Sequence, residues 1–193
     1  MSSTNRKNNK REKSDYYVTP IDCIKLFLYE WIKDEDIGIT KNTRFLDCSA
    51  GGDSKHGMSY ADVITEEFGT SPMTIDIRPD SKAEIIADYL TYNIPNPKPD
   101  IIISNPPFFL AQEFITKALA DVVPDGYVIM LLRLNFLESK ARKLFFTDNM
   151  PERIYVHHKR MSFTDDNKTD SIAYAHFVWH KGQKLSKSIL KII

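Results

Sequence analysis

The segment Ser104-Asn105-Pro106-Pro107-Phe108 combines residue types that can hold a flat heterocycle carrying an amino group. Two consecutive prolines remove two backbone donors and fix the local φ angles, so the chain leaves the preceding strand in one rigid shape. Asn105 precedes a proline and is therefore held extended. The Asn105 side-chain oxygen and nearby backbone carbonyls then accept amino hydrogens while Phe108 covers a ring face. A structural interpretation stays open, in which the segment is a proline-rich turn that ends on a core phenylalanine.

Glycines and acids stand at the ends of other short apolar runs. Gly51 and Gly52 permit positive φ angles and a close backbone approach to a ligand. Asp76 ends the next run, where an acid commonly holds a ribose diol in Rossmann-like sheets. Asp88 follows a third run. Each acid could equally serve as a helix cap or turn residue, so it is their order together with the segment 104–108 that favours a binding site.

The elements that position these residues alternate between short apolar runs and helical stretches. Strands are predicted at Arg44–Cys48, Met73–Ile77, Glu84–Ala87, Asp100–Ser104 and Tyr127–Leu132, and helices at Gly57–Phe68, Phe109–Val122 and Phe136–Phe146. The run Asp100–Ser104 lacks polar alternation, as expected of a strand covered on both faces. The alternation predicts an α/β fold with a doubly wound, mostly parallel sheet, in which ligands bind beyond the carboxyl ends of the strands. Arg153–His157 and Ile172–His180 are predicted to form an antiparallel C-terminal hairpin at one sheet edge.

A helix is predicted before the first strand. Thr19 is its expected N-cap and Pro20 its first residue. Apolar residues at helical spacing continue to about Lys33. The acidic triplet that follows, Asp34-Glu35-Asp36, is expected to be a solvated connection.

Composition bounds the class of protein. No run approaches the roughly 18 apolar residues of a membrane span, the polar N-terminus is unlike a signal peptide, and two cysteines make neither a disulfide framework nor a metal quartet. We therefore expect a cytoplasmic protein with no membrane partner and no metal site. The 26 basic and 26 acidic residues cancel, yet residues 1–14 carry +4, residues 15–132 carry −10 and residues 133–193 carry +6. The neutral sum therefore does not exclude a nucleic-acid partner.

Domain organisation follows from the same features. Residues 1–15 are predicted to form a disordered basic arm, because they are almost entirely Ser, Asn, Lys and Arg. Residues 16–193 are predicted to form a single domain, since no linker long enough to separate a second one is present.

Taken together, these residues resemble the S-adenosylmethionine-dependent amino-methyltransferases, whose shared signature is (N/D/S)PP(Y/F), and most closely their adenine-N6 branch. The resemblance covers most of residues 16–180 and implies a Rossmann-like methyltransferase fold with S-adenosyl-L-methionine as cofactor. The cofactor-binding residues it implies are Tyr17, Thr19, Pro20, Asp47, Ala50, Gly51, Asp76, Asp88 and Asn105, with Asp76 on the ribose hydroxyls and Asp88 facing the cofactor's adenine. The catalytic residues it implies are Asn105, Pro106, Pro107 and Phe108.

The resemblance also implies the reaction, which is transfer of a methyl group to the N6 amino group of adenine in DNA, with the base flipped out of the stack. A second aromatic ring often clamps the other face of the base. Phe163 is the candidate for that ring, and Lys159 and Arg160 beside it are predicted to meet phosphate. Phe163 could instead anchor the polar loop 158–171.

One residue departs from the family's pattern, because Asp53 stands where the turn usually has a glycine. Asp adopts left-handed geometry at some cost. A rearranged loop or a reduced affinity for the cofactor is therefore expected.

Other functions stay open at this stage. They are adenine-N6 methylation of structured RNA, methylation of protein glutamine, and a non-catalytic partner role. The glutamine family uses NPPY, so Phe108 and the basic C-terminal part argue against it. Asp53 supports the non-catalytic role, while the intact segment 105–108 argues against it. The length leaves no room for a separate target-recognition domain, as in compact stand-alone enzymes of the phage kind, so loose specificity is expected. The oligomeric state is open, with a monomer favoured.

Overall fold

The computed structural model describes residues 17–163, 169 and 171–193, which form an eight-stranded mixed sheet in the order β3-β2-β1-β4-β5-β7-β6-β8. The strands are β1 Phe45–Asp47, β2 Met73–Asp76, β3 Ile85–Ile86, β4 Ile101–Ser104, β5 Tyr127–Arg133, β6 Arg153–Val156, β7 Tyr174–His180 and β8 Ile189–Ile192. The α-helices are α1 Ile21–Glu35, α2 Ser59–Phe68, α3 Ala111–Asp121 and α4 Lys143–Asp148. The predicted doubly wound α/β fold is confirmed, whereas the predicted arm of residues 1–15 lies outside the described residues.

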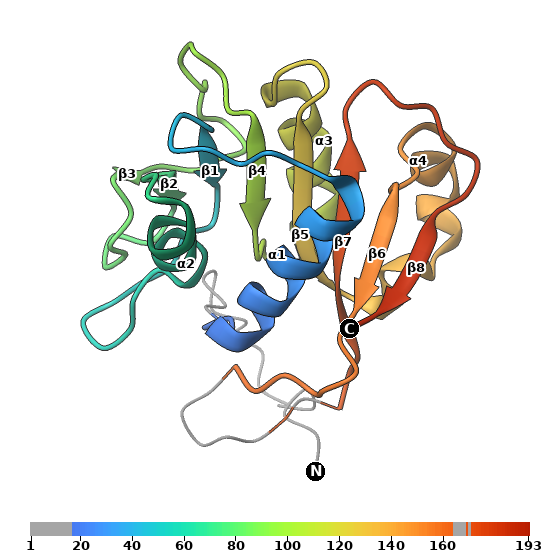
Figure 1. Ribbon diagram of the computed structural model, residues 1–193, viewed down its shortest axis with the longest axis horizontal. Coiled ribbons are helices and arrows are strands. Elements are labelled where there is room, and N and C mark those ends of the chain that lie inside the picture. The colour runs from blue at the N-terminus through green and yellow to red at the C-terminus, as the bar shows by residue number, and fades with distance from the viewer. Residues whose placement is uncertain (1–16, 164–168, 170) are drawn as a thin grey trace.

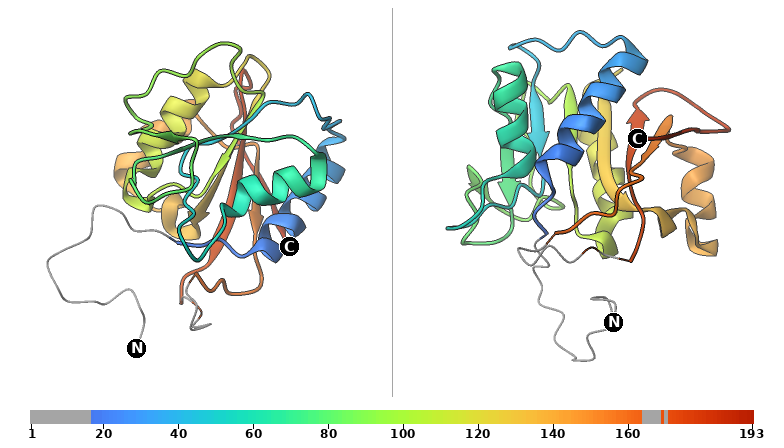
Figure 2. Two further views of the ribbon diagram at one scale, coloured as in Figure 1. Left: turned by 90° about the vertical axis from the view of Figure 1, so that its left-hand side faces the viewer. Right: turned by 60° about the horizontal axis from the view of Figure 1, so that its bottom comes forward.

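Helices cover both faces of the sheet, as Figures 1 and 2 show. α1 and α2 lie on one face, and α3 and α4 on the other. Ile101, Ile102 and Ile103 of β4 alternate between these two cores and are at most 3% exposed. Burial on both faces is why this strand has no polar alternation.

The start of α1 differs in detail from the prediction. Pro20 is the N-cap, and its carbonyl accepts hydrogen bonds from the backbone N–H groups of Cys23 and Ile24. The expectation that Thr19 caps the helix is wrong, because its buried hydroxyl is turned inward and accepts a hydrogen bond from Asn105. The N-terminal segment is thereby tied to the end of β4.

The acidic end of α1 is also not a solvated connection. The helix extends to Glu35, which forms an ion pair with Arg153 of β6. Asp34 accepts hydrogen bonds from Tyr155 of β6 (3.1 Å) and from Lys191 of β8 (2.8 Å). These pairs hold the carboxyl end of α1 across the last strands of the sheet.

The C-terminal half departs furthest from the sequence prediction. β6 and β7 pair in antiparallel fashion as predicted, but β7 lies between β5 and β6, and β8 forms the edge by pairing parallel with β6. The hairpin is therefore not at the edge, and β8 was not predicted. The helix predicted over residues 136–146 is broken into two 3₁₀ turns and α4. Ser139 starts a new turn there, because its side chain accepts the N–H of Ala141.

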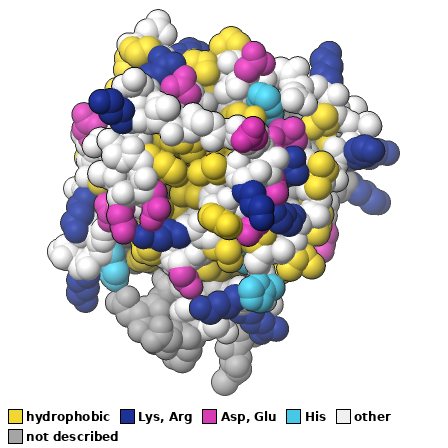
Figure 3. Space-filling view, viewed as in Figure 1, with side chains coloured by type: hydrophobic (Ala, Val, Ile, Leu, Met, Phe, Trp, Pro, Cys, Tyr) yellow, Lys and Arg dark blue, Asp and Glu magenta, His cyan; other side chains and the backbone are white. Residues whose placement is uncertain are grey.

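Charged side chains of both signs are interspersed over the face shown in Figure 3, with a group of Lys and Arg side chains at its lower edge. None of the helices in the described ranges is long and apolar enough to cross a membrane.

Candidate active site

The candidate site lies where the carboxyl ends of β1, β2 and β4 meet, at the lower edge of Figure 1. The amino end of α1 reaches the same edge, and so does the segment that follows β6. The parallel strands thus bring together residues from the first, second and fourth strands, as an open α/β sheet does for ligands in general.

Asn105 is held at the end of β4 by one hydrogen bond. Its Nδ2 donates to Oγ1 of Thr19 at 3.1 Å. Its Oδ1 is buried and has no partner among the described residues. The carbonyl of Pro106 accepts no backbone hydrogen bond from them either. Two acceptors of adjacent residues are therefore left without a hydrogen bond from the described residues, and such acceptors suit an amino group.

The ring of Phe108 belongs to an aromatic cluster. Its centroid lies 6.0 Å from that of Tyr17 and 5.6 Å from that of Tyr174, and the guanidinium of Arg133 lies 4.7 Å from it. Phe163 joins the same cluster edge-on, against Tyr17 at 5.6 Å and Tyr174 at 4.8 Å, and is 7% exposed. The structure thus brings Phe163 near the site through Tyr17 and Tyr174. Its role as a clamp on the base stays a prediction.

Asp47 lies at the end of β1, where it is 1% exposed. Its Oδ1 accepts hydrogen bonds from the Ser104 hydroxyl at 2.6 Å and from the Ser49 N–H at 3.2 Å. Its Oδ2 is buried without a partner. Burial, with a smaller contribution from the charge of Asp76, raises the pKa of Asp47 to about 7. A buried acid with one unused oxygen is suited to a cationic group.

The turn after β1 is fixed by its glycines and by groups from the next strand. Gly51 and Gly52 have φ angles of 69° and 76°, as the residue types predicted. The Gly51 N–H donates to Oδ2 of Asp76 at 2.8 Å, the Gly51 carbonyl accepts from Ser81, and the Gly52 carbonyl accepts from Arg78. Asp76 also accepts the Arg78 N–H through Oδ1. Each carboxylate oxygen has a second lone pair, which leaves Asp76 able to accept from a diol.

Asp53 is not left-handed, which corrects the expectation for this position. Its Oδ1 accepts hydrogen bonds from the N–H groups of Lys55 at 2.7 Å and His56 at 2.8 Å, and the His56 ring lies 3.0 Å away. These hydrogen bonds lower the pKa of Asp53 to about 2. Since Gly51 and Gly52 already supply the positive φ angles, Asp53 closes the next turn without the strain expected of it.

The remaining predicted residues have simpler surroundings. Ala50 is buried, and its N–H donates to the carbonyl of Ile75 in β2. Asp88 is exposed after β3 and closes its own turn by accepting the N–H of Leu90. Lys159 is exposed and lies 3.3 Å from Asp22 at the start of α1, and Arg160 is exposed beside it.

A buried series of polar side chains lies beneath the site and was not predicted from the sequence. The Tyr60 hydroxyl lies 2.8 Å from Nε2 of His176. The other ring nitrogen of His176 lies 2.8 Å from Nε2 of His157. Burial lowers the pKa of His157 to about 4 and holds the pKa of His176 well below its ordinary value, which favours neutral rings. The two histidine rings are hydrogen-bonded to each other. No group of three potential metal ligands occurs among the described residues.

No sequence profile of a known protein family matches the chain. Over 115 residues it is 24% identical to core protein VP3 of Bluetongue virus 2 (isolate USA), covering 58% of this chain and 12% of that protein. The chain thus spans a small part of that relative's length.

Solved structures are similar in fold. A candidate class I S-adenosylmethionine-dependent methyltransferase of Listeria monocytogenes superposes with a TM-score of 0.64 and 14% identity, over 91% of this chain and 65% of that one. A candidate RNA methyltransferase of Pyrococcus horikoshii superposes with a TM-score of 0.62 and 15% identity, over 90% of this chain and 93% of that one. The M protein of the type I restriction enzyme EcoKI superposes with a TM-score of 0.60 and 14% identity, over 94% of this chain and 49% of that one. The chain has the class I S-adenosylmethionine-dependent methyltransferase fold, and it spans less than two thirds of the first and third of these proteins.

Proposed function

We propose that this protein transfers a methyl group from S-adenosyl-L-methionine to the N6 amino group of adenine in DNA, presented as a flipped-out base. Asn105, Pro106, Pro107 and Phe108 are its catalytic segment. The residues proposed to bind the cofactor are Tyr17, Thr19, Pro20, Asp47, Ala50, Gly51, Asp76, Asp88 and Asn105.

The observation that carries the proposal is the state of the Asn105 amide. Its nitrogen donates to Thr19, while its oxygen is buried and has no partner among the described residues, so it is available to accept a hydrogen bond. An unpartnered buried acceptor costs stability, which a substrate amino group would restore by donating to it. The Pro106 carbonyl provides the second acceptor, and a primary amino group has two hydrogens to give.

The residues present fit the cofactor. The unused oxygen of Asp47 matches the ammonium of a methionine moiety, and Asp76 retains lone pairs for a ribose diol. When bound, S-adenosylmethionine supplies an electrophilic methyl group on a positive sulfonium. The chain's own contribution is positioning: Asn105 and Pro106 orient the amino nitrogen and draw its hydrogens into their plane, which leaves its lone pair free for in-line attack.

DNA is proposed as the substrate because NPPF is closest to the adenine-N6 branch and because the EcoKI M protein shares the fold. RNA is a second candidate, since the similar P. horikoshii protein, a candidate RNA methyltransferase, is covered over 93% of its length. Phe163, Lys159 and Arg160 are proposed to contact the substrate in either case.

Tritiated methyl transfer tests the proposal. The purified protein is incubated with labelled cofactor and unmethylated DNA, bulk RNA or protein extract, and nucleosides are analysed. We expect N6-methyladenine in DNA. Asn105→Ala should abolish methyl transfer while calorimetry still detects cofactor binding. Asn42→Ala changes an exposed residue just before β1, at the amino ends of the parallel strands, and should keep both transfer and cofactor binding. Label in RNA alone would move the proposal to RNA, whereas label in protein alone, or activity that survives Asn105→Ala, would overturn it.

A further inference from the structure

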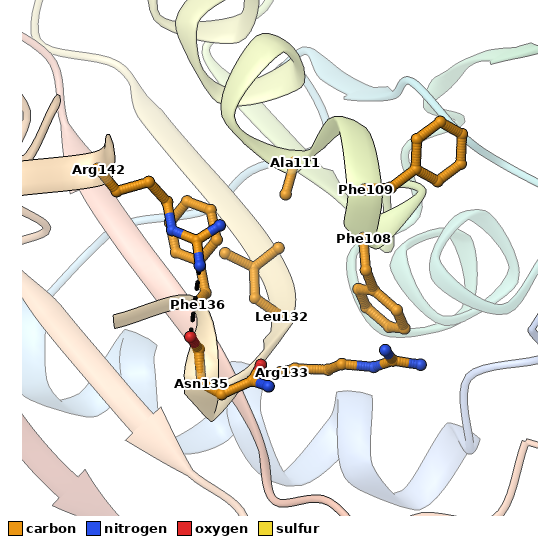
Figure 4. Close-up of a pocket in the computed structure, with 8 residues that line it drawn as sticks. All are labelled: Phe108, Phe109, Ala111, Leu132, Arg133, Asn135, Phe136 and Arg142. Carbon is orange, nitrogen blue, oxygen red and sulfur yellow. Dashed lines mark hydrogen bonds between the residues drawn. The ribbon is translucent and has the colours of Figure 1, made fainter. Parts of the chain in front are cut away.

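A pocket of about 150 Å³ opens beside Phe108, on the side of the site that faces away from β1. Figure 4 shows its lining, which comes from the end of the NPPF segment, the start of α3, and the end of β5 with the turns that follow it. The lining residues are Phe108, Phe109, Ala111, Leu132, Arg133, Asn135, Phe136 and Arg142. None of them is acidic, and two are arginines.

Each arginine is stacked on a phenylalanine of the pocket. The guanidinium of Arg133 lies 4.7 Å from the ring centroid of Phe108, and that of Arg142 lies 4.6 Å from that of Phe136. The two stacks stand on opposite sides of the pocket in Figure 4. Stacking on a ring fixes the plane of a guanidinium and therefore the directions in which its N–H groups point.

The donors of these arginines are incompletely used. The Nε atoms of both side chains are buried and have no hydrogen-bond partner. Arg142 donates only to two backbone carbonyls, those of Asn135 and Glu138. No carboxylate of the described residues forms an ion pair with either arginine. Buried donors of a cation without an anion are costly, so the pocket favours an anionic ligand.

The other lining groups indicate which anion. Phe109 is 63% exposed, which leaves its ring available for stacking, and Asn135 presents an exposed amide at the rim. Planar guanidinium groups match phosphate oxygens, and an exposed aromatic ring suits a nucleobase. The pocket also shares Phe108 with the catalytic segment, so its ligand must be continuous with, or adjacent to, whatever binds there.

We infer that this pocket is a subsite for the nucleotide next to the target adenine, in which Arg133 and Arg142 bind its phosphate and Phe109 stacks on its base. This inference rests on the proposed function, because it identifies the ligand as the strand that carries the methylated base. Such a subsite would let this single sheet and its connecting turns bind the DNA strand on either side of the target base. A flipped nucleotide leaves its neighbours' phosphates close to the mouth of the site, where these arginines lie.

Salt-dependent binding of a fluorescent, unmethylated DNA oligonucleotide tests the inference without any methyl transfer. Each phosphate contact contributes about one unit to the slope of log K against log salt concentration, or somewhat less on a single strand. Arg133→Gln and Arg142→Gln should each reduce that slope, by up to about one unit when both are changed, and each should weaken binding at low salt by about fivefold or more. Lys184→Gln, which removes an exposed cation from the loop between β7 and β8, should change the affinity by less than twofold. Thermal unfolding of every variant confirms that it is folded.

A methylphosphonate linkage beside the target adenine provides the chemical counterpart. It should weaken binding to the wild-type protein, have a smaller effect on Arg133→Gln or Arg142→Gln, and have no further effect when both arginines are changed, since the phosphate charge and the arginines interact directly. Unchanged slopes in both arginine variants, or methylphosphonate effects that add fully to theirs, would overturn the subsite. A wild-type protein that binds DNA through these arginines yet methylates only protein would instead overturn the proposed function and leave only the phosphate contacts of the two arginines.

Discussion

The hydroxyl of Tyr60 lies 2.8 Å from Nε2 of His176, which joins α2 to β7 beneath α1. The other ring nitrogen of His176 lies 2.8 Å from Nε2 of His157, and Thr19 separately accepts a hydrogen bond from Asn105. Hydrogen-bonded series in a dry interior polarise one another and fix side-chain orientation. The Tyr60–His176–His157 series therefore joins α2 and β7 to the end of β6, while Thr19 fixes the Asn105 amide.

Thr19 is the link that orients Asn105, and its hydroxyl is the testable part. Thr19→Val keeps the shape and removes the acceptor for Nδ2, so the amide is free to turn and present its nitrogen to the substrate. We expect kcat for methyl transfer, measured at saturating cofactor, to fall by about tenfold or more. Thr19→Ser restores the hydroxyl and should restore most of kcat. Equal rates for Val and Ser variants would contradict a positioning role.

Features that depend only on residues close together in the chain were predictable from the sequence. The run before Ser104 is apolar because β4 is buried on both faces, and Gly51 and Gly52 have the positive φ angles that their residue type allows. Strand β8 was missed because Ile189 and Ile192 are 54% and 68% exposed, and such an edge has no buried alternation to detect.

Contacts between residues far apart in the chain were not predictable in the same way. Thr19 has the residue type of an N-cap, and only its approach to Asn105, 86 positions away, decides its role. Asp53 stands in place of a glycine, but its turn is closed by hydrogen bonds from the N–H groups of Lys55 and His56. These bonds could not be predicted from the residue types alone. Tyr60 has the helical position of an ordinary core residue.

Asp47 should make cofactor affinity depend on pH. Its pKa of about 7 means that the carboxylate gains a proton as the pH falls from 8 to 6, and a neutral acid pairs poorly with an ammonium group. Calorimetric Kd values for S-adenosylmethionine should rise toward about tenfold per pH unit below pH 7. Asp47→Asn should bind the cofactor weakly at every pH. Asp125→Asn changes a residue just before β5, at the end of that strand away from the site, and its cofactor affinity should follow that of the wild type. A Kd that is flat from pH 6 to pH 8 would rule out the pairing.

Gly52 should tolerate no side chain. Its φ of 76° disfavours alanine, and an added Cβ would lie 2.9 Å from Cγ of Met58 and 3.0 Å from Cβ of Lys82. Gly52→Ala should therefore lower the free energy of unfolding by about 2 kcal/mol or more and weaken cofactor binding. Gly69→Ala separates the two causes, because its φ is 65° but its Cβ would meet nothing within 4 Å, so about 1 kcal/mol is expected. Similar losses at both positions would show that the contacts at Gly52 are harmless.

The buried histidine pair should weaken the fold in acid. Burial holds the pKa of His157 at about 4, below the ordinary 6.5, with His158 adding to the effect and Asp22 opposing it. As the pH falls from 6.5 toward 4, the unfolded chain therefore binds this proton first, and the stability present above pH 6.5 is progressively lost. His157→Gln keeps a hydrogen-bonding amide and removes the titration, so its free energy of unfolding in urea should fall less steeply between pH 6.5 and 4.5 than that of the wild type. His158→Gln, at the exposed neighbouring position, should leave the steep dependence in place. If the wild type and His157→Gln show the same slope, the proton is taken up elsewhere in the unfolded chain, and the pair does not set the acid limit of the fold.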